Sequence, residues 1–139
     1  MASNLLLSFL GQNGGLGHGE LGFALRNSSR TSCQTRGYPG ILFLDPGGHP
    51  LATNSTRTTR DFFGQTPIVG LVLAPGQSAS FRLGVTHVPV GAAACVTASG
   101  LQVIAPNDTA TLHVTMPFGA YECGTATVSP LRPGTSAYP

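Results

Sequence analysis

The sequence is poor in charged residues. Only 9% of its 139 residues are Asp, Glu, Lys or Arg, and the formal net charge is +2, whereas an average soluble protein has about 25% charged residues. Lysine is absent, and the seven basic residues are arginines scattered along the chain without interleaved aromatic residues. Nucleic-acid binding needs clustered cations. We therefore expect no nucleic-acid partner.

Long apolar runs are also absent. The longest one near the start, residues 5–10, has no cationic flank and no small-residue cleavage site after it. A membrane span needs about 18 such residues, and a signal peptide needs both of those flanking features. We expect neither in this chain. If the protein is exported, its export signal has been removed or lies upstream of Met1.

Local motifs for catalysis and for cofactors are missing. No Gly-x-Ser-x-Gly, Cys-x-x-Cys or paired-histidine spacing occurs, and these are the patterns of a serine nucleophile and of common metal sites. Residues 17–22 match Gly-x-Gly-x-x-Gly, but a strand is predicted to follow them where dinucleotide binding needs a helix. We expect no cofactor, no metal and no enzymatic activity. The alternative is a small hydrolase or metal-dependent enzyme assembled from distant residues.

Short segments of alternating apolar and polar residues are abundant. They are separated by turns rich in Gly and Pro, which together make up 30 of the 139 residues, and a period of two is the signal of a β-strand. The pattern predicts one all-β sandwich domain over residues 1–139, with residues 132–139 as a frayed tail. The continuous apolar run at 41–44 is predicted to be buried on both faces, and residues 74–77 to form a hairpin. The eight predicted strands are 4–10, 20–27, 40–45, 69–74, 79–88, 100–105, 110–116 and 125–131.

Three blocks followed by two cysteines carry a family resemblance. They are GFALRNS at 22–28, CQTRGYPG at 33–40 and LAPGQS at 73–78, followed by Cys95 and Cys123. In this order they resemble the actinobacterial domain-of-unknown-function family 4232 over nearly the whole chain. The resemblance implies an immunoglobulin-like antiparallel sandwich and an exported or lipid-anchored cell-envelope protein. It implies no established activity.

The three cysteines admit one disulfide with three possible pairings, or three buried reduced thiols in a cytosolic protein. In an immunoglobulin-like sandwich the segments that begin near Cys95 and after Cys123 start at the same end, while Cys33 lies at the other. We therefore favour a Cys95–Cys123 disulfide. Domains of the resembled family usually have a further cysteine before the first strand, where this chain has residues 1–4. The resemblance thus implies that Cys33 is left unpaired.

Residues 54–67 form the segment with the best claim to function, because long loops on a rigid sandwich often hold binding residues. Arg57 and Arg60 beside Phe62 and Phe63 suit an anionic, partly apolar ligand or an envelope partner. The plainer interpretation is that one Phe plugs the core while the arginines keep the loop soluble. We expect a non-catalytic binding or interaction module that works through this loop and through the Gly-rich loop around His18. A structural spacer domain is the alternative.

Overall fold

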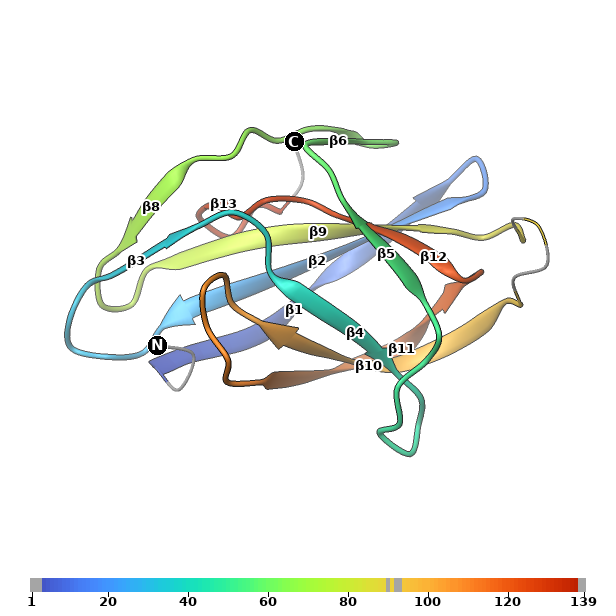
Figure 1. Cartoon of the computed structure of the whole chain (residues 1–139), viewed down its shortest axis with the longest axis horizontal. Coiled ribbons are helices and arrows are strands. Elements are labelled where there is room, and N and C mark those ends of the chain that lie inside the picture. Colours follow the sequence, from blue (N-terminus) through green and yellow to red (C-terminus); the bar gives the residue numbers. More distant parts are fainter. Residues whose placement is uncertain (1–3, 90, 92–93, 138–139) are drawn as a thin grey trace.

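The computed structural model describes residues 4–89, 91 and 94–137, and these form an all-β domain (Figure 1). Each of the eight segments predicted from alternation contains a strand, so the predicted fold class is confirmed. The strands are β1 (Leu5–Gly15), β2 (His18–Asn27), β3 (Cys33–Arg36), β4 (Gly40–Leu44), β5 (Asn54–Arg57), β6 (Arg60–Asp61), β7 (Gly64–Gln65), β8 (Gly70–Leu73), β9 (Ser78–Thr86), β10 (Val96–Ile104), β11 (Leu112–Glu122), β12 (Thr125–Val128) and β13 (Arg132–Pro133).

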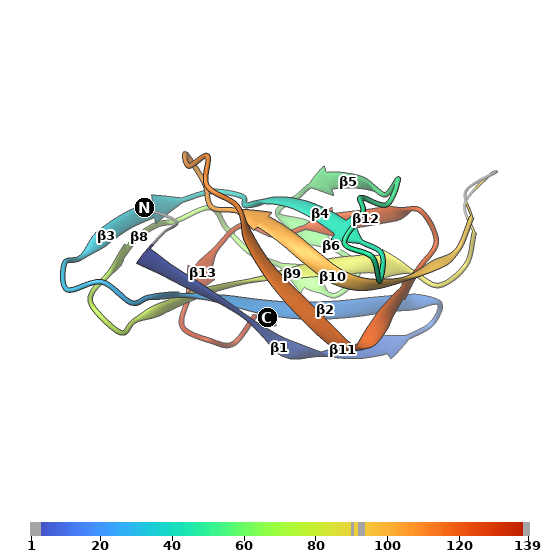
Figure 2. The same cartoon turned by 90° about the horizontal axis from the view of Figure 1, so that it is seen from below.

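Two sheets pack face to face as a sandwich (Figure 2). The larger sheet has the order β1-β2-β9-β12-β5, with β13 also paired to β9, and the smaller sheet has the order β11-β10-β4. The stacked rings of Phe23 and Phe81, whose centroids are 5.4 Å apart, lie in the core with the fully buried Leu101 and Val103 of the smaller sheet. Alternation of side chains across each strand explains why the period-two pattern predicts these strands.

Three details differ from the sequence prediction. The pairing of β5 with β12 is parallel, so the sandwich is not entirely antiparallel. Residues 74–77 do form a turn, in which the Gln77 amide donates to the Ala74 carbonyl over 2.9 Å. However, β8 pairs with β3 and not with β9, so this turn joins two sheets and is not a hairpin. Strand β4 is an edge strand, and its Leu42 is only half-buried.

The outer face of the larger sheet is covered by the β6–β7 hairpin and by the end of the chain. Arg82 of β9 points to this face and is 1% exposed. Its guanidinium pairs with Asp61 of the hairpin and donates to the Thr66 hydroxyl over 2.8 Å. Strand β13 pairs with β9, and Ala137 is fully buried. The frayed tail predicted for residues 132–139 is therefore wrong for 132–137, and residues 138 and 139 lie outside the described part of the chain.

The disulfide joins Cys95, just before β10, to Cys123, between β11 and β12, as predicted. Cys33 is a free and buried cysteine at the opposite end of the domain, near the start of β1 (Figure 1). Helices long and apolar enough to cross a membrane are absent from the described residues.

Candidate functional site

Two phenylalanines of the predicted binding loop join a histidine on the outer face of the larger sheet. The Phe62 ring stacks on His18 of β2 with centroids 3.9 Å apart, and Phe63 meets Phe62 edge-on at 5.2 Å. Phe62 remains 53% exposed. The structure therefore brings together the two segments that the sequence singled out, the 54–67 loop and the Gly-rich loop at His18.

The two arginines of that loop lie elsewhere. The Arg57 guanidinium is 6.0 Å from the centre of the Tyr38 ring, a cation–π contact near the far edge of the larger sheet. Arg60 is exposed, and its guanidinium donates to the Gln65 side chain over 3.4 Å. These two arginines are not among the residues that line the hollow beside Phe62 and Phe63. The four residues predicted to share one site are thus divided between separate surfaces.

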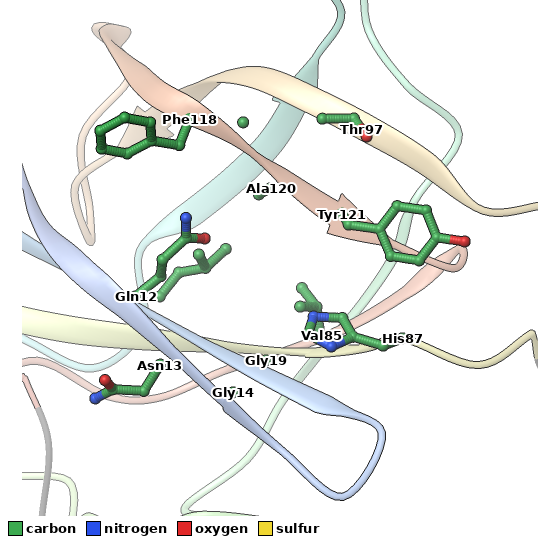
Figure 3. A pocket seen from close by; sticks show the side chains of 12 residues that line it. Gln12, Asn13, Gly14, Gly19, Val85, His87, Thr97, Phe118, Ala120 and Tyr121 are labelled. Carbon is green, nitrogen blue, oxygen red and sulfur yellow. The ribbon is translucent and has the colours of Figure 1, made fainter.

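A different cleft lies between the two sheets at the end of the sandwich that carries the β1–β2 hairpin. It has a volume of about 390 Å³ and opens to solvent between this hairpin and strands β10 and β11 (Figure 3). Leu21, Val85 and Ala120, all buried, contribute apolar surface to it. We call this hollow the end cleft. Its polar and aromatic side chains are those of Gln12, His87, Thr97, Phe118 and Tyr121.

Phe118 lies on the rim of the end cleft because β11 contains a bulge. Ala98 pairs with Ala120 and Gly100 pairs with Thr115, so residues 116–119 oppose Ser99 alone. Such bulges bend a strand and re-aim its side chains, and they often occur beside active or binding sites. Phe118 is consequently 89% exposed.

Two glycines of the end cleft fit only because they lack a side chain. Gly119 has a φ of +70°, and a Cβ there would lie 2.5 Å from the Cγ2 atom of Thr97. A Cβ on Gly19 of β2 would lie 2.5 Å from Nε2 of His87. The His87 ring therefore rests directly over the hairpin backbone, with its centroid 6.0 Å from that of Tyr121. The glycines thus fix where the rings of the cleft are placed.

The end cleft offers hydrogen-bonding side chains. Among the described residues that line it, Asp, Glu, Lys and Arg are absent. Within the described part of the chain, the side chains of Gln12, His87, Thr97 and Tyr121 have no hydrogen-bond partner of their own. In Figure 3 the Gln12 amide points into the cleft, while Asn13 turns to the other side of the hairpin. Donors and acceptors are thus free beside apolar surface, as in typical ligand sites.

Charge is concentrated instead on the opposite side of β2. Glu20 is 6% exposed, and its Oε2 lies 3.9 Å from Nε of Arg82 and accepts no hydrogen bond. Burial raises the pKa of this carboxyl above its usual value. The positive charge of Arg82 lowers the pKa, the negative charge of Asp61 raises it further, and a hydrogen bond from Asn13 lowers it. This cluster holds the β6–β7 hairpin against the sheet and faces away from the end cleft.

Sequence reasoning missed the end cleft because the predicted strand at 110–116 stops before the bulge. A local signal was present: Pro117 and Gly119 lie inside an apolar alternation that runs through Met116, Phe118 and Ala120. Proline and glycine inside a strand pattern indicate a bulge. The free groups of Gln12 and His87, by contrast, come from strands far apart in the sequence, and no local pattern joins them.

Comparison with known protein families gives a match over most of the chain. A family model described as a domain of unknown function, DUF4232, matches residues 1–132 of the chain. No curated protein and no solved structure matches the chain.

Proposed function

The chain belongs to the DUF4232 family, whose description names no function, and on that premise we propose that it is an exported, non-catalytic binding module whose ligand occupies the end cleft. The observation that carries this proposal is Phe118. A phenylalanine that is 89% exposed on a bulge held by a glycine is unfavourable in water, and a large exposed apolar group beside a cleft is typical of a binding surface.

Export is supported by the Cys95–Cys123 disulfide, because disulfides persist in oxidising compartments and are rare in the cytosol. The resemblance to actinobacterial envelope proteins points the same way. We therefore place the module at the cell envelope, where its ligand is an envelope component.

Binding without catalysis is supported by the residues that line the end cleft. Among the described residues of the lining, His87 is the only imidazole, and carboxylate, cysteine and serine side chains are absent. General acid–base and nucleophilic catalysis usually need such groups in hydrogen-bonding pairs. The lining fits recognition better than bond cleavage.

The test is co-sedimentation of the purified domain with a washed, insoluble actinobacterial envelope fraction. We expect the wild-type domain to sediment and the Phe118→Ala and Tyr121→Ala variants to stay in solution. Phe62→Ala is the matched control, because it also removes an exposed aromatic ring but does not line the end cleft. Circular dichroism would verify that each variant is folded.

Two results would contradict the proposal. No sedimentation of the wild-type domain would favour a structural spacer. Loss of sedimentation in Phe62→Ala or Arg57→Ala, with Phe118→Ala unaffected, would show that the binding site lies in the 54–67 loop and not in the end cleft.

A further inference from the structure

The lining and the exposed aromatic rings of the end cleft suggest the chemical class of its ligand. We infer that the end cleft binds a neutral saccharide, an inference that rests on the proposed function. Four properties of the cleft carry it: its charge, its aromatic rings, its free hydrogen-bonding groups and the shape of the strands that flank it.

The absence of Asp, Glu, Lys and Arg from the lining disfavours a charged ligand. A charge that leaves water for such a site would find no opposite charge to compensate its lost hydration. An anionic ligand would fit better near the exposed Arg57, which faces another surface. The ligand expected here is therefore neutral.

The exposed rings of the cleft suit the faces of sugar rings. Phe118 and Tyr121 both come from β11, and they are 89% and 50% exposed. An aromatic face carries partial negative charge, and the C–H groups on one face of a pyranose or furanose ring are weakly positive and apolar. Stacking of a sugar on these rings would cover apolar surface that is now exposed to water.

The free polar groups suit hydroxyls, which both donate and accept hydrogen bonds. Gln12 offers an amide oxygen and an amide nitrogen, and the hydroxyls of Thr97 and Tyr121 can each play either role. All three side chains line the cleft, and they have no hydrogen-bond partner within the residues that the structure describes. A hydroxyl-rich ligand would therefore satisfy groups that now bond only to water.

The flanking strands argue against an extended peptide, the other neutral polymer that such a cleft could take. A peptide that joins a sheet needs a continuous row of free backbone groups along an edge strand. Strand β11 is an edge strand, but its bulge at residues 116–119 contains Pro117, which has no N–H. Strand β1, the edge strand of the larger sheet, is also bulged, between Phe9 and Gly11. Neither edge strand offers an unbroken ladder along its whole length.

The experiment is a titration of the isotopically labelled domain, followed by NMR, with defined soluble probes. The neutral probes are gluco-, galacto-, manno- and arabino-oligosaccharides of about two to six units. This range suits a cleft of about 390 Å³ that is open to solvent, so that a longer probe can extend out of it. The comparison probes are oligogalacturonate, which is anionic, and an uncharged pentapeptide. Shifts of the amide signals of Gln12, Gly119 and Tyr121 would locate the bound probe.

We expect at least one neutral oligosaccharide to bind saturably with an affinity that salt leaves unchanged. Phe118→Ala, Tyr121→Ala and Gln12→Ala should each weaken that binding by about tenfold, the effect of losing about 1.4 kcal/mol, while Phe62→Ala leaves it intact. Saturable binding of the pentapeptide in place of the sugars, with the same dependence on Phe118, would overturn the saccharide inference and leave the binding module standing. If envelope sedimentation depends on Phe118 but no neutral sugar binds, the saccharide inference is again wrong. If neither envelope sedimentation nor sugar binding depends on Phe118, both the saccharide inference and the proposed function are wrong.

Discussion

The guanidinium of Arg82 and the carboxylate of Asp61 form a two-point ion pair beneath the β6–β7 hairpin. Nε donates to Oδ2 over 2.7 Å and Nη2 donates to Oδ1 over 3.2 Å. Their side chains are 1% and 2% exposed. A hairpin of only two plus two residues, β6 and β7, is therefore fastened to the larger sheet by charge.

Removal of one partner of this pair should be costly. We expect Asp61→Asn, which keeps the size of the side chain, to lower the free energy of unfolding by about 3 kcal/mol, because it removes the closer of the two carboxylates beside the buried Arg82 charge and leaves only Glu20, at 3.9 Å. Urea unfolding followed by circular dichroism measures this. Arg60→Gln, at an exposed arginine one residue away, is the control and should change stability by less than about 0.5 kcal/mol. A loss below about 1 kcal/mol in Asp61→Asn would show that the hairpin is held in another way.

Glu20 should make stability depend on pH in a direction that its burial decides. Burial raises the pKa of its carboxyl above the usual 4.5, so the folded protein holds the proton at a pH where the unfolded chain has lost it. Above the pKa that Glu20 has in the folded protein, its buried carboxylate lowers the free energy of unfolding. This loss of stability disappears as the pH falls to about 4.5, the pKa in the unfolded chain. We expect Glu20→Gln to be more stable than the wild type at pH 7, with the difference shrinking toward pH 4.5. Urea midpoints at a series of pH values test this, and a difference independent of pH would refute it.

The disulfide should be a large part of the stability. Cys95 and Cys123 are 28 residues apart, and closure of a loop of that length stabilises by about 3 to 4 kcal/mol in the chain-entropy model. We expect the double variant Cys95→Ser, Cys123→Ser to lose about this amount in denaturant unfolding. Cys33→Ser is the control for loss of a thiol, and should change stability much less than the double variant.

Thiol labelling checks the same assignment independently. In the oxidised protein only Cys33 should react with an alkylating reagent, and only after unfolding, because it is buried. Peptide mapping that finds Cys33 in a disulfide, or rapid labelling in the folded state, would contradict the pairing.

Gly119 tests whether the bulge places Phe118. Alanine there must adopt a φ of +70° and its Cβ would lie 2.5 Å from Cγ2 of Thr97. A positive φ costs about 1 to 2 kcal/mol for a non-glycine residue, and the clash adds to this. We expect Gly119→Ala to be destabilised by about 2 to 4 kcal/mol in urea unfolding and to lose envelope sedimentation.

Two variants separate the clash from the backbone strain. Gly134→Ala has a φ of +86° with no atom within 4 Å of the added Cβ, so it should show the strain alone. Thr97→Ser removes Cγ2, and Gly119→Ala made in this background should recover part of its stability. Equal losses in Gly119→Ala and Gly134→Ala would mean that contact with Thr97 is unimportant.

Alternation of apolar residues predicted the strands that place several side chains in the core, and it missed short strands that bury few apolar side chains. Strand β9 buries Ala79, Phe81, Leu83 and Val85 at every second position, and its pattern is visible in the sequence. Strand β5 is exposed along its whole length and belongs to the sheet only through its hydrogen bonds with β12. Backbone groups are alike in every residue, so the sequence carries no signal for that pairing.

The candidate site was predictable only in part for a related reason. Phe62 and His18 were each suggested by their own loops, but their 3.9 Å stack depends on how the hairpin folds back over β2. The ion pair that fixes this hairpin joins residues 21 positions apart. Contacts of this range follow from the tertiary fold, which local patterns do not specify.

The order of strands in the larger sheet has a consequence for biosynthesis. Strand β9 pairs with β2 on one side, and on the other with β12 and β13, which lie near the end of the chain. Until residues 125–133 have left the ribosome, β9 keeps an open edge and β5 has no strand to join. A nascent chain therefore carries unpaired strands until β12 and β13 emerge, the state in which chaperones recognise it and aggregation competes with folding. The larger sheet is complete only after β12 and β13 have been synthesised and have paired with β9.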